Sequence, residues 1–197
     1  MVMVTSLIFL ILGYVVGAIP TGYFFCKFFF NMDITASGSG NIGASNVGRV
    51  LGKKYFIIIF VLDALKAYAA LVFANLAIHS YSMQSWFLHL VVAGLLVGNA
   101  YSFLLNFKGG KGVATTCGII FFMLPWFMGL GFVATWLIVL AITKTPFWAS
   151  LASILALLLS VVLYGSFQQV VFVGIIFMWL LFRHSTNLVA WLRTKAF

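Results

Sequence analysis

The chain has 197 residues, of which 64% are hydrophobic and only 7% are charged. Soluble globular domains carry about 25% charged residues, so this composition excludes an ordinary soluble domain and indicates a membrane protein. Eleven Lys and Arg face two acids, but they are scattered at the ends of apolar runs, so anionic lipid or a small phosphorylated substrate is the expected partner and nucleic acid is not.

Long apolar runs recur along the chain and predict transmembrane helices. The first run is not preceded by the basic residues of a secretory signal, so it is interpreted as a membrane helix. We expect an all-α integral membrane protein in which residues 1–197 form a single transmembrane domain. Its seven expected spans cover residues 4–25, 55–78, 85–105, 112–125, 127–143, 149–165 and 168–183.

The basic residues predict the orientation of these spans. The connections at 26–54, 106–111, 144–148 and 184–197, with the adjoining Arg183, hold ten of the eleven Lys and Arg. The opposite connections hold none, and positive charge marks the cytoplasmic side of a membrane protein. We therefore expect the N-terminus outside, the C-terminus in the cytoplasm, and cytoplasmic active-site loops at about 31–54, 106–112 and 183–197.

The first long connection carries the segment SGSGNIGASNVGR, from Ser37 to Arg49. Its glycines, serines and asparagines are typical of an irregular loop. One interpretation is a flexible linker. The other is an anion pocket, because this run of hydrogen-bond donors ends in an arginine.

The stretch NFKGGKGVATT, from Asn106 to Thr116, joins two apolar runs and carries two lysines without an acid. Glycine lets backbone N–H groups approach an anion, and the start of a helix adds a favourable dipole, so the stretch predicts a phosphate site. It is not a nucleotide-binding P-loop, because Gly112 follows Lys111 where that motif needs Ser or Thr. The alternative is that Lys108 and Lys111 only anchor the chain at the membrane surface.

Two charges lie inside the second expected span, at Asp63 and Lys66. Their spacing places them on one helix face, either as a relay for protons or substrate or as a structural ion pair. In the third span, Gly94 and Gly98 would let a neighbouring helix approach closely.

His184, in the segment FRHSTN, is a candidate general base or hydrogen-bond donor to an anion. Neither a CxxC nor an HxxxH spacing occurs in the sequence. No metal and no other cofactor is therefore expected.

Together these segments resemble the bacterial membrane glycerol-3-phosphate acyltransferases that use acyl phosphate as donor. The first signature of that family, approximately SGNxGATNxxR, is matched by SGNIGASNVGR at residues 39–49. The core of the second, KGGKGVAT, is intact at residues 108–115. The third, approximately RHxxNIxRLxxGxE, is matched by Arg183, His184, Asn187 and Leu188. The chain departs from these signatures, which have His, Pro, Arg, Gly and Glu, at Asn99, Ser102, Ala190, Thr194 and Ala196.

The resemblance implies transfer of a fatty acyl group from acyl phosphate to the 1-hydroxyl of sn-glycerol 3-phosphate, in the cytoplasmic (inner) membrane of a bacterium. Catalysis is assigned to His184, Asn187, Lys111 and Arg49. Binding of substrate or phosphate is assigned to Ser39, Gly40, Asn41, Asn46, Lys108, Gly109, Gly110, Gly112, Thr115 and Ser150. Membrane lipid and an enzyme that produces acyl phosphate are further candidate partners.

An acyl phosphate is already activated, so direct attack without a covalent intermediate is expected. The signature Glu is absent at Ala196, so the departing phosphate is the expected proton acceptor. The acyl chain is expected between helices, where Gly94 and Gly98 would leave room for it.

Two other functions stay open from the sequence. A transporter or channel for a small organic phosphate would also use Asp63, Lys66 and a basic surface, although no pair of broken helices recurs in the two halves. A catalytically degraded relative would bind substrate without converting it, as the missing His and Glu suggest.

Overall fold

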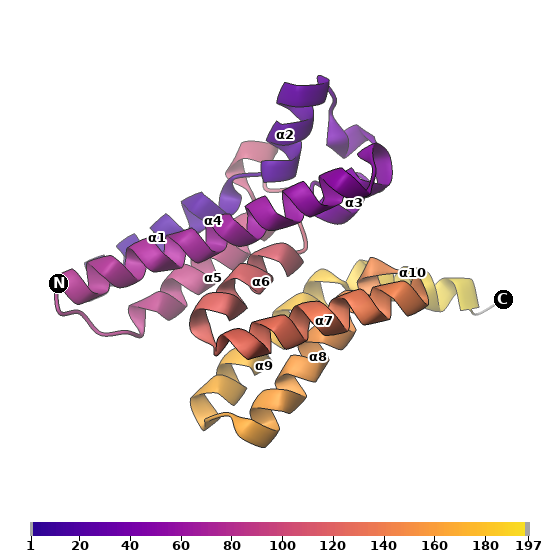
Figure 1. The fold of residues 1–197 in the computed structure, drawn as a ribbon. Coiled ribbons are helices and arrows are strands. Elements are labelled where there is room, and N and C mark those ends of the chain that lie inside the picture. The colour runs from indigo at the N-terminus through magenta and orange to yellow at the C-terminus, as the bar shows by residue number, and fades with distance from the viewer. Residues whose placement is uncertain (1, 196–197) are drawn as a thin grey trace. The chain divides into compact units, whose positions relative to one another are not determined.

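The computed structural model describes residues 2–195, and every regular element in this range is a helix. The chain divides into two compact units, Met1–Phe122 and Met123–Phe197, called here the first and second unit (Figure 1). The first unit contains α1 (Val2–Ala18), α2 (Thr21–Phe30), η1 (Ile34–Ala36), α3 (Ala44–Leu51), α4 (Lys53–Ser80), α5 (Phe87–Ala100), η2 (Phe103–Leu105) and all but the last residue of α6 (Val113–Met123). The second unit contains α7 (Trp126–Thr143), α8 (Pro146–Tyr164), α9 (Phe167–Arg183) and α10 (Ser185–Lys195).

Helices occupy all seven stretches that were predicted as spans, but they differ in length. Four are long and apolar enough to cross a membrane: Val2–Phe30, which joins α1 and α2, Lys53–Ser80, Trp126–Thr143 and Pro146–Tyr164. The pair α9 and α10, bent by 50°, makes a fifth if it counts as one span. The apolar helices α5 and α6 have 14 and 11 residues. At 1.5 Å per residue they are about 21 and 17 Å long, against a hydrocarbon core of about 30 Å.

Close contact between α1 and α5 forms the centre of the first unit. Each helix carries a GxxxG motif, GYVVG in α1 and GLLVG in α5. A Cβ built on Gly13 would lie 2.4 Å from the main-chain oxygen of Val91, and one built on Gly98 would lie 2.2 Å from that of Tyr14. The expected close helix approach is therefore confirmed, and the missing side chains let the two backbones touch.

The same contact contradicts the expectation that an acyl chain lies in room left by Gly94 and Gly98. A Cβ on Gly94 would lie 2.3 Å from the oxygen of Leu10, so the backbone of α1 already fills the space beside these glycines. Helix α1 has glycines of its own, Gly13 and Gly17, in this contact, and they let its backbone come close enough to leave no room for a chain.

The first span is interrupted between α1 and α2, and an ion pair on α4 bonds to the residues at this interruption. Pro20 separates α1 from α2, because its ring prevents a normal helical hydrogen bond. Lys66 on α4 donates to the main-chain oxygen of Ile19 at 2.7 Å and pairs with Asp63 at 2.7 Å. The Thr21 hydroxyl donates to Asp63 at 2.8 Å. This arrangement supports the interpretation of Asp63 and Lys66 as a structural ion pair.

The connection predicted as an irregular loop contains two helices, η1 and the eight-residue α3. Helix α3 packs on α4 through a core cluster that includes Val47 and Ile59, both fully buried. Gly48 permits this contact, because a Cβ there would lie 2.5 Å from the Cβ of Phe56. Apolar residues on one face of a short polar segment thus dock it as a helix.

In the second unit, α7 and α8 form a helical hairpin (Figure 1). Lys144 closes it in the left-handed conformation, with φ of 55°. The C-terminal segment that was expected to be a loop forms α10 after a bend at His184. Ala196, the position of the missing Glu, lies outside the described residues.

Candidate functional site

Asn46 holds the first polar segment together from inside. It is 1% exposed, and its side-chain oxygen accepts the main-chain N–H of Ser39 at 2.7 Å. Its side-chain nitrogen donates to the main-chain oxygens of Ser37 at 2.9 Å and Ile34 at 3.3 Å. These hydrogen bonds use the amide within the loop, so Asn46 shapes the segment rather than facing outward.

The other first-loop candidates lie at the surface of that folded segment. Ser39, Gly40 and Arg49 are exposed, and Asn41 is half-buried and accepts the N–H of Gly43 at 2.9 Å. Gly40 has φ of 69°, a conformation that other residues seldom adopt. The guanidinium of Arg49 lies 3.4 Å from the Asn46 side-chain oxygen. The Ser39 hydroxyl and the Arg49 guanidinium are thus both exposed on the same folded segment, where an anion could bind them.

Asp33 begins this loop and caps η1. Its carboxylate accepts hydrogen bonds from the Thr35 hydroxyl at 2.6 Å and from the Thr35 N–H at 2.8 Å. These hydrogen bonds, the one from the hydroxyl first, lower the pKa of Asp33 below its usual value. The carboxylate is therefore charged at neutral pH and serves the loop's structure.

The stretch from Asn106 to Thr116, called here the glycine-lysine segment, is fixed against the end of α5. Ser102 and Lys108 form an antiparallel bridge, and the Ser102 hydroxyl donates to the main-chain oxygen of Ala18. This serine also caps η2 by accepting the N–H of Leu104 at 3.2 Å. The Ser102 side chain thus forms hydrogen bonds with main-chain groups in place of the helical hydrogen bonds that would continue α5. This explains why α5 ends at Ala100 and not at the predicted residue 105.

Beyond the bridge, Gly109 and Gly110 pass directly over α5. A Cβ on Gly109 would lie 2.3 Å from the oxygen of Asn99 and 2.5 Å from that of Ala100, so only glycine fits. Gly112, with φ of 85°, leads into α6. Lys111, which lies between Gly110 and Gly112, is half-buried, whereas Lys108 is exposed. The predicted arrangement of bare backbone, lysine and helix start is therefore present in the first unit.

Three buried polar atoms accompany this segment. The side-chain oxygen of Asn99 and the hydroxyls of Thr115 and Thr116 have no hydrogen-bond partner within residues 2–195. Asn99 is 7% exposed and Thr115 is 1% exposed. A buried polar group without a partner costs about 1–3 kcal/mol, which is typical of sites where a ligand or water completes the bonding.

His184 lies at the junction of α9 and α10 and is 3% exposed. Its Nδ1 is 2.8 Å from the main-chain oxygen of Leu180, so Nδ1 carries a proton and donates to that carbonyl. The ring stacks on Phe147 with 5.7 Å between centroids. In the neutral ring, Nε2 is then the acceptor. This hydrogen bond and ring contact fix the orientation of the imidazole.

Ser150, predicted as a binding residue, is 3% exposed and already bonded. Its hydroxyl donates to the main-chain oxygen of Pro146 at 2.8 Å and accepts the indole N–H of Trp136 at 3.2 Å. These bonds join α7 to α8, so the structure gives Ser150 a packing function.

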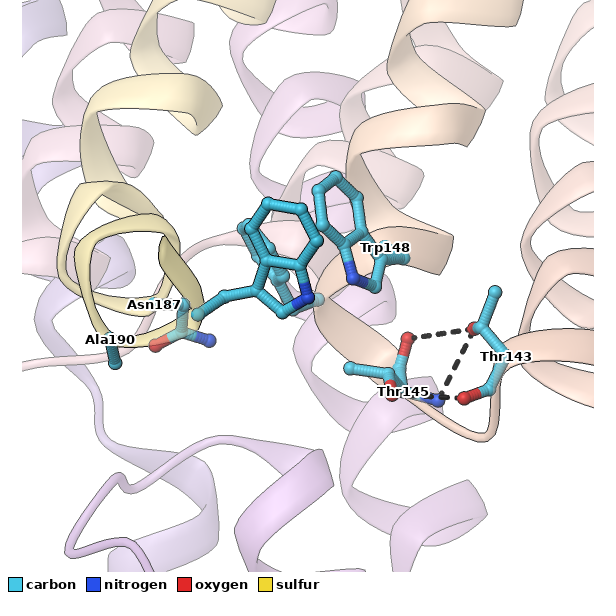
Figure 2. Close-up of a pocket in the computed structure, with 7 residues that line it drawn as sticks. Thr143, Thr145, Trp148, Asn187 and Ala190 are labelled. Carbon is cyan, nitrogen blue, oxygen red and sulfur yellow. Dashed lines mark hydrogen bonds between the residues drawn. The ribbon is translucent and has the colours of Figure 1, made fainter. Parts of the chain in front are cut away.

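A cavity of about 550 Å³ lies in the second unit, and the sequence analysis did not predict it. Figure 2 shows Trp148 on α8, the turn with Thr143 and Thr145, and Asn187 with Ala190 on α10. Phe147 and Trp191 complete the lining. The two tryptophan rings meet edge to face, with 5.1 Å between centroids. Lining residues more than 40 positions apart become neighbours only through the fold.

The structure therefore groups the predicted residues within each unit. The first unit holds the Asn46-braced loop and the glycine-lysine segment, and the second holds His184 and Asn187 at the start of α10. Within the described residues, no group of three or more His, Cys, Asp or Glu could hold a metal ion.

Comparisons with known proteins agree over nearly the whole chain. The sequence profile described as glycerol-3-phosphate acyltransferase matches residues 7–194. Glycerol-3-phosphate acyltransferase 2 of Thermotoga maritima is 38% identical over 185 residues, covering 92% of this chain and 90% of the relative. Glycerol-3-phosphate acyltransferase of Helicobacter pylori is 39% identical over 157 residues, covering 76% and 68%.

A solved structure has the same fold. It is the crystal structure of PlsY (YgiH), an integral membrane glycerol 3-phosphate acyltransferase, in its glycerol 3-phosphate form. The TM-score is 0.83 at 31% sequence identity, and the match covers 96% of this chain and 93% of that one. A lysophosphatidic acid form of the same protein matches with a TM-score of 0.81.

Proposed function

Because this chain belongs to the glycerol-3-phosphate acyltransferase family, we propose that it transfers a fatty acyl group from acyl phosphate to the 1-hydroxyl of sn-glycerol 3-phosphate. The products are lysophosphatidic acid and inorganic phosphate. The profile match over residues 7–194 supports this reaction, as do the forms in which the solved relative was crystallised.

The observation that carries the proposal is the glycine-lysine segment at the start of α6. A phosphate group needs hydrogen-bond donors and positive charge, and here Gly109, Gly110 and Gly112 flank a half-buried lysine along the chain. We assign Lys111 to one phosphate, together with the backbone N–H groups from Gly109 to Gly112 other than that of Gly110, which donates to the main-chain oxygen of Asn99. We assign the exposed Arg49 and Ser39 to the other, with Asn46 as the residue that holds their loop in shape.

The chemical step is direct displacement at the acyl carbon. The 1-hydroxyl oxygen of glycerol 3-phosphate forms a bond to the carbonyl carbon, and the bond from that carbon to the phosphate oxygen breaks. The hydroxyl proton passes to an oxygen of the departing phosphate, so no carboxylate base is needed. Positioning and neutralisation of charge supply the catalysis.

His184 and Asn187 complete the proposed machinery. Because Nδ1 donates to Leu180, Nε2 is the acceptor of the neutral ring, and we assign the imidazole to orienting the attacking hydroxyl. Asn187 follows at the start of α10, where its amide can bind glycerol 3-phosphate.

We further propose a multi-pass protein of the bacterial cytoplasmic membrane with seven membrane segments. In this topology the N-terminus is outside and the polar loops and C-terminus are cytoplasmic, as the Lys and Arg asymmetry favours. The short α5 and α6 would cross only part of the bilayer. Membrane lipid and an enzyme that supplies acyl phosphate are the proposed partners.

Purified protein in detergent tests the reaction through release of phosphate from acyl phosphate. Release that requires glycerol 3-phosphate and gives lysophosphatidic acid is the expected result. Binding of both substrates without release would identify a degraded relative instead. Uptake of glycerol 3-phosphate by proteoliposomes, with no acyl transfer, would identify a transporter.

A further inference from the structure

The five residues 18–22, called here the junction, join α1 to α2. A helix ends with main-chain oxygens that have no helical donor, and side chains from other elements bond to two of them here. The Ser102 hydroxyl donates to the oxygen of Ala18, and the Lys66 ammonium donates to that of Ile19 at 2.7 Å. The start of the junction is therefore held in place from outside α1.

The glycine-lysine segment attaches to the junction through Ser102. The main-chain oxygen of Ser102 accepts the N–H of Phe107 at 2.8 Å, and Ser102 forms the antiparallel bridge with Lys108. Ser102 is 1% exposed, so water does not compete for its bond to Ala18. A displacement of Ala18 is thus passed on to the segment that carries Lys111.

The first polar segment, residues 37–49, lies on the other end of the junction. A Cβ built on Gly22 would lie 2.1 Å from the main-chain oxygen of Ile42 and 3.2 Å from the side chain of Val47. Both contacts belong to this segment, so its backbone rests directly on Gly22 without a side chain between them. A displacement of Gly22 is therefore passed on to the segment that carries Arg49.

Thr21 fixes the position of Gly22. Its hydroxyl donates to the Asp63 carboxylate at 2.8 Å and lies 3.4 Å from the Lys66 ammonium. Asp63 is 6% exposed, so this hydrogen bond is also shielded from water. With about 3.8 Å between successive Cα atoms, the four steps from Ala18 to Gly22 span at most about 15 Å. The anchors of the two segments are therefore close neighbours along one short stretch of chain.

We propose that the junction positions both phosphate-binding segments together, with Ser102 and Thr21 as its positioning residues. The inference rests on the proposed function, in which these two segments hold the two phosphates. One segment is bonded to the start of the junction and the other rests on its end. Loss of either hydroxyl therefore loosens the segment at the opposite end of the junction as well as its own.

Hydrogen–deuterium exchange tests this coupling without turnover. The N–H groups of Ser39 and Gly110 report on the two segments, because each donates a hydrogen bond within the first unit. Ser102→Ala should speed exchange at Ser39, and Thr21→Val should speed it at Gly110, each about fivefold, the usual effect of one hydrogen bond. Ser6→Ala, which removes a hydroxyl-to-carbonyl bond of 2.8 Å near the start of α1, is the control and should change neither amide.

Steady-state kinetics gives a second measurement. Thr21→Val should raise KM for glycerol 3-phosphate and KM for acyl phosphate, each about fivefold, because both phosphate segments are loosened. Thr21→Ser keeps the hydroxyl and should restore both values. A hydroxyl needed only for folding would lower the melting temperature and the amount of active protein and leave both KM values unchanged.

The proposal fails if each segment proves to be anchored by itself. Exchange that rises only at the amide nearest each replacement would show this, and so would a Thr21→Val protein in which only one KM changes. Equal impairment of Thr21→Ser and Thr21→Val would also overturn the role of the hydroxyl. Reciprocal changes in exchange, in a parent protein that transfers no acyl group, would reject the proposed function and leave the coupling of the two segments standing.

Discussion

The main-chain oxygen of Asn99 accepts the N–H of Gly110 at 2.8 Å. This bond ties the glycine-lysine segment to the end of α5, although the two residues are in different elements of the first unit. The segment therefore has a defined shape before any ligand arrives. Preorganised backbone donors stabilise an anion without further ordering, which is the main electrostatic contribution expected of such a site.

Replacing Gly109 with Ala should disrupt this arrangement. The new Cβ would meet the oxygens of Asn99 and Ala100 at 2.3 and 2.5 Å, so the segment must shift. We expect KM for a phosphorylated substrate to rise at least about tenfold, since a misplaced donor loses about 1.4 kcal/mol or more. Gly131→Ala, where nothing lies within 4 Å, is the control and should behave as the parent. Unchanged KM in the Gly109 variant would contradict the assignment.

The two lysines of the segment should differ in importance. Lys111 is half-buried and Lys108 is exposed, so only the first is placed to neutralise a phosphate away from bulk water. Lys111→Ala should lower kcat by about 100-fold or more, as when one charge stabiliser of a transition state is lost. Lys108→Ala should lower it only slightly. Equal and small effects in a steady-state assay would show that both lysines only anchor the membrane surface.

Replacements of His184 test its role in the proton step. Gln can keep part of the hydrogen bonding of the imidazole and Ala cannot, so His184→Gln should retain more activity than His184→Ala. Because the ring is buried, the melting temperature of each variant must be measured beside its kcat. If both variants were equally inactive while Ala196→Glu raised turnover by orders of magnitude, transfer of the proton to phosphate would have to be abandoned.

The pair Asp63 and Lys66 should matter for stability. Lys66→Met leaves the Asp63 carboxylate buried without its cation and should destabilise the protein by about 3–5 kcal/mol. The double variant Asp63→Asn/Lys66→Met removes both charges and should recover much of that loss. Thermal unfolding in detergent measures both. Normal stability with lost activity would instead indicate a relay.

Cysteine labelling checks the proposed orientation. In a variant without Cys26 and Cys117, a cysteine at Ser39 should react with an impermeant reagent only from the cytoplasmic side. A cysteine at Ser82, in the connection without basic residues, should react only from outside. The reverse pattern would refute the positive-inside prediction.

The sequence predicted the positions of the helices well, because hydrophobic runs dominate in a membrane protein. It misplaced the end of α5 by five residues, since the choice depends on what the Ser102 hydroxyl bonds to. It also missed α3 and α10. Both are short helices beside membrane segments, and tertiary contacts rather than long apolar runs stabilise them.

The candidate site was predicted in part, for a similar reason. Local features such as Gly109, Gly110 and Lys111 could be recognised because their chemistry lies within one short segment. The bracing role of Asn46 could not, since a polar side chain in a glycine-rich loop looks the same whether it faces a ligand or its own backbone. The cavity was missed because its walls come from α8 and α10, which no sequence period connects.

The interlocked glycines of α1 and α5 limit how this sequence can drift over generations. Gly13, Gly17, Gly94 and Gly98 each face main-chain atoms of the opposite helix, and no replacement of a side chain there can remove those atoms. A larger residue at any of the four therefore has no compensating neighbour mutation and requires the whole helix to move. Gly174 has open space around it and is free of this restriction. Neutral substitutions should therefore accumulate at positions with open space, such as Gly174, and not at the contact between α1 and α5.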